Sequence, residues 1–207
     1  VIRRGAPPDR LHMNCSGKHA AMLASCVAAG WPTATYRDPA HPLQAEIRRT
    51  IERLAGQPVT AVGVDGCGAP LFALPVAGLA RAFRSMVLSD QGSPERTVAD
   101  AMRTYPDWTS GSTRPERVLM DAVPGLMLKS GAEGVEAFAL ADGRAGAFKI
   151  DDGAARARPP VTVALLQALG AAAGPGVDAE ALERVALAEV TGGGRRVGEI
   201  RAVLGGR

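Results

Sequence analysis

The sequence is poor in aromatic residues, which make up only 4% of its 207 residues. A core with so few large rings must be filled mainly by small aliphatic side chains. The sequence also lacks any apolar run of the roughly 18 residues that would cross a bilayer. Hydrophobic residues still reach 46% and charged residues 22%, a balance typical of a soluble globular protein. We therefore expect a single domain over residues 1–207.

An excess of charge of one sign is also missing. The formal net charge is +3, the sequence pI is about 9.0, and no basic run is interleaved with aromatic residues. Nucleic-acid binding is therefore not expected. The first ten residues, VIRRGAPPDR, contain no apolar stretch of the kind found in secretory signals. We expect a cytoplasmic protein with neither nucleic acid nor membrane as a partner.

Cysteine is scarce, and the three cysteines lie at positions 15, 26 and 67. This odd number does not have the spacing of a disulfide framework. In a reducing compartment, cysteines with polar neighbours indicate metal binding or catalysis more than a bridge. Cys26 lies on the apolar face of a predicted helix, so we interpret it as a core residue.

Helical periodicity and caps alternate with a few short strand patterns along the chain. Thr113 and Glu116 have capping-box spacing. Asp142-Gly143 predicts a type I′ hairpin turn. Gly192-Gly193-Gly194 lies in a tail with no clear pattern. The helices are expected at 16–29, 42–55, 75–87, 161–169 and 178–188, with further starts near 94 and 113, and the strands at 59–64 (buried), 126–130, 135–141 and 144–150.

The order of these elements does not alternate strand with helix, which argues against a doubly wound parallel sheet. Helices come first, followed by one strand, more helices, a hairpin region and final helices. This order predicts the α+β class, with an antiparallel sheet flanked by helices.

The most distinctive polar cluster is Asn14-Cys15-Ser16-Gly17-Lys18-His19, at the start of a predicted helix. The positive end of a helix dipole lowers the pKa of a thiol placed there. Cys67, bracketed by glycines and two residues after Asp65, offers a second soft ligand for zinc. The alternative is structural, with a small buried cysteine and a lysine and histidine on a solvated turn.

A second candidate is Lys129-Ser130-Gly131, which closes a predicted strand. A K-[ST]-G tripeptide on a strand is the third motif of the serine penicillin-recognising enzymes, where its lysine lines the active site. The alternative is a strand end with a solvated lysine. Arg156-Ala157-Arg158 is interpreted as a solvated turn without chemistry.

Four segments in this order resemble the asparaginase II family, the rhizobial-type L-asparaginases. The resemblance covers nearly the whole chain and implies a serine β-lactamase-like fold, incomplete at its N-terminus. It also implies hydrolysis of L-asparagine to aspartate and ammonia, and dimers of the enzyme. The segments are MNCSGKHAAML, VDGCGAPLFALPV, KSGAEGVEAF and AFKIDDGAARARPPV.

The resemblance also assigns roles to residues. It implies a zinc ion held by Cys15, Lys18 and Cys67, with the lysine as a free amine. Lys129 is implied as the catalytic lysine that activates a serine hydroxyl. The residues implied to contact the substrate are His19, Asp65, Arg114 and Ser130.

One family feature is missing, because the family nucleophile belongs to an S-x-x-K motif. None of the eight serines has a lysine three positions later. We therefore expect the C-terminal part of an asparaginase, truncated and inactive alone. Two alternatives stay open. One is an inactive remnant that binds zinc or a small amino acid. The other is a plain structural domain with scattered cysteines.

Overall fold

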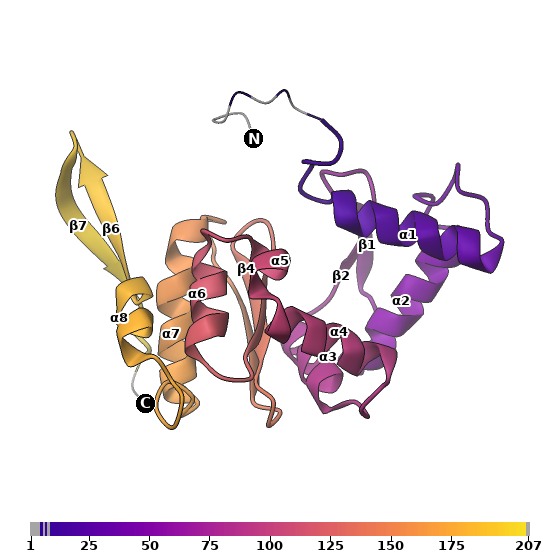
Figure 1. Ribbon diagram of the computed structural model, residues 1–207. Helices are drawn as coiled ribbons and strands as arrows, with labels where there is room; N and C mark the ends of the chain where they lie inside the picture. The colour runs from indigo at the N-terminus through magenta and orange to yellow at the C-terminus, as the bar shows by residue number, and fades with distance from the viewer. Residues whose placement is uncertain (1–4, 6, 8, 206–207) are drawn as a thin grey trace. The chain divides into compact units, whose positions relative to one another are not determined.

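The chain folds into two compact units, described separately below (Figure 1). The first unit comprises residues 1–53 and 57–74, and the second comprises residues 54–56 and 75–207. The computed structural model describes residues 5, 7 and 9–205. Residues 1–4, 6 and 8, which belong to the segment searched for a secretory signal, lie outside the described residues.

Two helices and a hairpin build the first unit. The hairpin pairs β1 (Ala61–Val64) with β2 (Pro70–Ala73) in antiparallel register. Helices α1 (Ser16–Ala29) and α2 (Pro42–Ala55) confirm both predicted helices in this region. Gly30 ends α1 with a left-handed φ of 69°, a conformation that glycine adopts without steric cost.

The strand predicted at 59–64 exists, but the prediction that it is buried was wrong. All four residues of β1 are exposed. Val62 and Val64 point into solvent because the strand pairs with β2 alone, in a two-stranded sheet. The apolar run therefore reflects strand propensity and not burial.

The core of the first unit is small and contains few large side chains. Met22, Cys26, Leu43 and Ala69 are buried in it, and Cys26 has no exposed surface, as predicted. The amide of buried Gln44 donates to the Tyr36 carbonyl at 2.7 Å, which ties the loop between the helices to α2. Partly buried hydrophobic residues complete this core: Trp31, Tyr36, Ile47 and Cys67.

The second unit is built around a three-stranded antiparallel sheet with the order β3-β4-β5. Its strands are β3 (Met127–Ser130), β4 (Val135–Ala139) and β5 (Ala145–Lys149). Its helices are α3 (Val76–Leu88), α4 (Pro94–Thr104), α5 (Pro106–Ser110), α6 (Pro115–Ala122), α7 (Arg158–Ala168), α8 (Ala179–Val185) and the short 3₁₀ helix η2 (Ala155–Ala157).

Helices pack on both faces of this sheet. Met127 and Ala139 face a cluster formed with α3 and α4. Leu128 and Phe138 face the opposite cluster, formed with α6, α7 and α8. Figure 1 shows α6 and α7 beside β4. This arrangement confirms the α+β class and the three strands predicted between residues 126 and 150.

Two details of the predicted capping and turns were wrong. Arg114, and not Thr113, is the N-cap residue of α6, and no side chain caps this end. Glu116 is instead buried. The β4–β5 turn is not type I′, which needs positive φ at both central residues, because only Gly143 has one.

The tail contains a hairpin where no regular structure was predicted. Strands β6 (Leu187–Gly192) and β7 (Arg195–Arg201) pair in antiparallel register around Gly193-Gly194. Both of these glycines have positive φ, as a two-residue hairpin turn demands. The helix expected at 178–188 is shorter, because β6 begins at Leu187. Among the described residues, no helix is long and apolar enough to cross a membrane.

Phe138 is the largest fully buried side chain of the second unit, and it provides a test of this packing. A Cβ added to Gly146, its partner on β5, would lie 2.6 Å from the Phe138 ring. Phe138→Ala should lower the free energy of unfolding by about 3–5 kcal/mol, measured by urea denaturation. Trp108 is 90% exposed, so the matched variant Trp108→Ala should change the free energy of unfolding by less than about 0.5 kcal/mol. Equal effects of the two variants would contradict this packing.

Candidate functional site

The first unit brings together polar side chains from the two cysteine-containing motifs. The Lys18 Nζ donates to Asp65 Oδ2 at 3.2 Å and to Cys67 Sγ at 3.3 Å. Cys67 Sγ lies 3.6 Å from the same carboxylate oxygen. Residues almost 50 positions apart in the sequence therefore form one cluster, as the sequence predicts.

The β1–β2 hairpin presents Asp65 and Cys67 on one shaped loop. The Asp65 amide donates to the Ala69 carbonyl at 2.9 Å, and the Gly68 amide donates to the Asp65 carbonyl at 2.8 Å. Gly68 has a φ of 80°, and a Cβ there would meet the Arg37 guanidinium at 2.6 Å. The positive φ therefore favours glycine at this position, whereas the Arg37 side chain could shift to make room for a Cβ.

Cys15 joins this cluster from the N-cap position of α1. Ligand atoms of Cys15, Asp65 and Cys67 lie within 4.8 Å of one another. Two sulfurs bound to one tetrahedral zinc, each at ~2.3 Å, would lie roughly 3.8 Å apart. Two thiols and a carboxylate are donor types that zinc accepts. The cluster is therefore a candidate metal site.

The cluster favours the charged forms of Lys18, Asp65 and Cys67. Burial lowers the pKa of Lys18, but hydrogen bonds to Cys67 and Asp65 outweigh burial and raise it overall. The Lys18 hydrogen bond lowers the pKa of Asp65. Burial raises the pKa of Cys67, whereas the Ala69 amide and Lys18 lower it, and the net direction is downward. A metal bound through the amine of Lys18 must displace a proton from it.

His19 takes a different place from its neighbour Lys18. Its ring is buried and packs edge-on against Tyr36, and its Nδ1 lies 2.6 Å from the Tyr36 hydroxyl. Burial lowers the pKa of His19, and the charges of Lys18 and Arg37 lower it further. Sequence reasoning singled out His19 but missed Tyr36, which lies in a loop without a recognisable motif.

The second unit holds the other predicted residues. Lys129 and Ser130 are the last two residues of β3, and the Lys129 Nζ donates to the Ser130 carbonyl at 2.6 Å. Lys129 is exposed and Ser130 is half-buried. Their predicted position at a strand end is confirmed.

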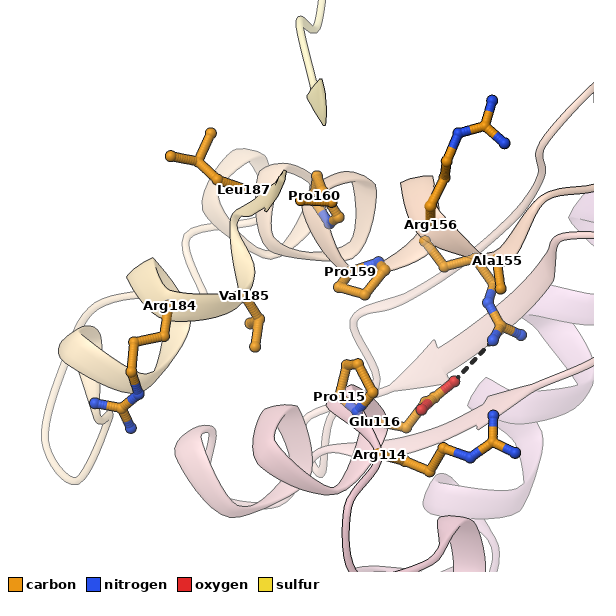
Figure 2. Close-up of a pocket in the computed structure, with 12 residues that line it drawn as sticks. Arg114, Pro115, Glu116, Ala155, Arg156, Pro159, Pro160, Arg184, Val185 and Leu187 are labelled. Carbon is orange, nitrogen blue, oxygen red and sulfur yellow. Dashed lines mark ion pairs between the residues drawn. The ribbon is translucent and has the colours of Figure 1, made fainter. Parts of the chain in front are cut away.

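Arg114 lines a cavity of about 370 Å³ in the second unit. Figure 2 shows Arg114 beside Glu116, whose carboxylate pairs with the Arg158 guanidinium at 3.1 Å. The remaining wall is largely apolar, and includes Pro115, Pro159, Pro160, Val185, Leu187 and Ala188.

The interpretation of Arg158 as a solvated turn residue was wrong. Arg158 begins α7 and is only 7% exposed. It pairs with Glu116 and faces Glu136 at 3.7 Å. A signal was present in the sequence: Glu136 occupies an inward position of an otherwise apolar strand, and such a carboxylate requires a buried partner.

The different burial of the cysteines gives a direct test. In native protein kept metal-free by a chelator, iodoacetamide should modify Cys15 and Cys67, which are partly exposed, and not fully buried Cys26. Peptide mass spectrometry measures each site, and urea should make all three thiols react. Native-state modification of Cys26 as fast as that of Cys67 would contradict the structure.

Comparison with protein families adds evidence that is independent of this geometry. The family model described as L-asparaginase II matches residues 1–202, nearly the whole chain. No curated protein matches the chain. The matched span includes the Cys15–Asp65–Cys67 cluster and the Lys129–Gly131 strand end. The chain therefore belongs to the L-asparaginase II family.

Proposed function

We propose that this chain serves the hydrolysis of the side-chain amide of L-asparagine, which yields L-aspartate and ammonia. Family membership supports an amidohydrolase. The observation that carries the proposal is the contact of Lys18 Nζ with Cys67 Sγ at 3.3 Å and Asp65 Oδ2 at 3.2 Å. A purely structural hairpin loop has no need to gather two thiols, an amine and a carboxylate at one partly exposed point.

In this proposal Cys15, Lys18 and Cys67 bind zinc. The bound ion would supply a fixed positive charge that helps to position the substrate. Asp65, next to these ligands, is suited to accept hydrogen bonds from the ammonium group of an amino acid. His19 is also proposed to contact the substrate. Its Nδ1 lies 2.6 Å from the Tyr36 hydroxyl, and this contact links the start of α1 to the loop that follows the helix.

In the second unit Lys129 is the proposed catalytic lysine. A neutral amine at a strand end can accept the proton of a serine hydroxyl and so activate it for attack on the amide carbon. Ser130 and Arg114 are proposed to contact the substrate. A helix-flanked antiparallel sheet with K-S-G at the end of β3 supports the proposed serine β-lactamase-like fold.

A second candidate function is binding without turnover. If these 207 residues are the whole protein, the absence of S-x-x-K from them favours this alternative, because the activated serine of the reaction then has no candidate in that motif. In this alternative the chain binds zinc or a small amino acid through the same residues. Both functions predict zinc binding and negligible turnover by these 207 residues alone, and they differ in whether the residues take part in hydrolysis.

The metal assignment predicts about one zinc per chain, measured by elemental analysis of purified protein. Cys15→Ala and Cys67→Ala should each weaken zinc binding by on the order of 100-fold or more, whereas Cys26→Ala should retain it. Lys18→Arg keeps the positive charge but cannot offer a neutral amine, so it should lose zinc if Lys18 is a ligand. Wild-type protein without zinc, or zinc retained in both cysteine variants, would refute the assignment.

Turnover tests whether these 207 residues contain a nucleophile of their own. We expect ammonia release from L-asparagine by these 207 residues to be negligible, because loss of a nucleophile costs on the order of 10⁶ in rate. Titration calorimetry should still detect binding of L-asparagine to the zinc-loaded protein. Substantial ammonia release would instead point to a nucleophile in the chain, and Ser16→Ala and Cys15→Ala would identify it.

A further inference from the structure

Four polar side chains are buried together beneath the sheet of the second unit. Glu136 on β4 is 1% exposed, Glu116 on α6 is 4% exposed, and Arg158 and Thr162 on α7 are 7% and 0% exposed. The Thr162 hydroxyl donates to Glu136 Oε1 at 2.6 Å. Arg158 Nη2 pairs with Glu116 Oε1 at 3.1 Å, the ion pair drawn in Figure 2. None of these contacts is required by the proposed metal site.

The charges of this group do not balance when both carboxylates are ionised. One guanidinium then faces two buried negative charges, and burying an unpaired charge is costly. Burial and, to a smaller extent, the neighbouring Glu116 carboxylate raise the pKa of Glu136 to about 7, against the opposing effects of Thr162, Arg158 and Lys129. These groups reach Glu136 from α6, α7 and β3, and its partner on β5 is the uncharged Phe148.

The same guanidinium holds the end of β3. Arg158 Nη1 donates to the Gly131 carbonyl at 2.9 Å. Ser130 lies opposite Glu136 in the β3–β4 register, and the Gly131 amide donates to the Val135 carbonyl at 2.9 Å. The Lys129-Ser130-Gly131 segment is thus held by its pairing with β4 and by the hydrogen bond from Arg158 to the Gly131 carbonyl.

The weakest link in the group lies between Arg158 and Glu136. Arg158 Nε and Glu136 Oε2 are 3.7 Å apart, and within the described part of the chain each lacks a hydrogen-bond partner. An ionised Glu136 attracts the guanidinium across this gap, whereas a protonated Glu136 attracts it far less. A guanidinium drawn toward Glu136 must change its angle to the Gly131 carbonyl, because its donors form one rigid planar group.

We propose that Arg158 and Glu136 are positioning residues for the Lys129–Gly131 strand end, and that one proton at Glu136 sets how Arg158 holds the Gly131 carbonyl. The link to catalysis rests on the proposed role of Lys129. The positioning itself can be measured without substrate, metal or turnover, so its failure is distinguishable from a failure of the proposed function.

The composition of the second unit lets the titration of Glu136 be followed without interference from other side chains that titrate near pH 7. Residues 75–207 contain no histidine and no cysteine, so Glu136 is the side chain there expected to titrate near pH 7. In ¹⁵N- and ¹³C-labelled chain, the Glu136 carboxyl carbon and the Gly131 amide should both shift with a midpoint near 7 between pH 5 and 9. Glu136→Gln should abolish the Gly131 shift. Glu183→Gln, which alters an exposed carboxylate on α8, should leave it unchanged.

Arg158→Lys separates positioning from simple proximity to a charge. The lysine keeps one positive charge but not the planar donor group that joins Gly131 to Glu136. The Glu136 carboxyl carbon should still titrate, whereas the Gly131 amide should no longer follow it. A Gly131 amide that ignores the titration in wild type, or that keeps its midpoint in Glu136→Gln, would overturn the proposal. If Arg158→Lys does not fold, the measurements on wild type and on Glu136→Gln still test the proposal.

Stability provides a second measurement. Because the folded-state pKa of Glu136 is raised from 4.5 to about 7, the folded unit retains its proton longer than the unfolded chain does. The contribution of Glu136 to stability is therefore complete below pH 4.5 and is lost as the pH rises through 7. The urea midpoint of wild type should fall over this range relative to that of Glu136→Gln. Identical pH profiles of the urea midpoint in the two proteins would contradict a buried proton bound at Glu136.

Discussion

The antiparallel register between β3 and β4 decides which side chains of these two strands share a face of the sheet. Pairing of Ser130 with Glu136 and of Lys129 with Ala137 sends consecutive residues of one tripeptide to opposite faces of the sheet. Lys129 therefore shares its face with Met127, and Ser130 shares its face with the buried carboxylate. A slip of β3 by one residue would turn Lys129 toward α6 and α7 and take Ser130 off the face that it shares with Glu136, so the core and the polar group depend on the same register.

The first unit relies on a different kind of constraint, because its core is small. The β1–β2 loop is held by backbone hydrogen bonds and by a glycine that leaves room for Arg37, and these fix Asp65 and Cys67 relative to each other. Lys18 approaches them from a helix whose start carries no acidic residue and no side-chain cap. Because Cys67 and Ala69 also pack into this core, backbone hydrogen bonds and apolar packing together hold the polar atoms close together.

The sequence was informative about some local patterns, although the capping box at Thr113 and Glu116 and the type I′ turn at Asp142-Gly143 were wrong. Gly30 predicts the end of α1, and the motifs containing Cys15 and Cys67 predict the cluster that they form with Lys18. Long-range partners are different, because nothing adjacent to Arg158 says that two carboxylates from α6 and β4 will surround it. The exposed β1 was misjudged for the same reason, since an apolar run does not reveal whether another layer covers it. The tail hairpin was missed although Gly193-Gly194 carries a turn signal, because neither flanking strand shows a regular alternation of apolar and polar residues.

The hairpin of β6 and β7 has a consequence for how copies of this chain behave at high concentration. Almost all its residues are exposed, and its two strands form a sheet with no third strand among the described residues. Free backbone donors and acceptors along such an edge can template the addition of a strand from a neighbouring molecule. Strand β7 carries three arginines (Arg195, Arg196 and Arg201) and one glutamate, Glu199, which pairs with Arg196 and Arg201, and the sum is a net charge of +2. Two identical β7 edges therefore repel each other when they approach. Screening by salt weakens this repulsion, and self-association through the hairpin should therefore increase with ionic strength.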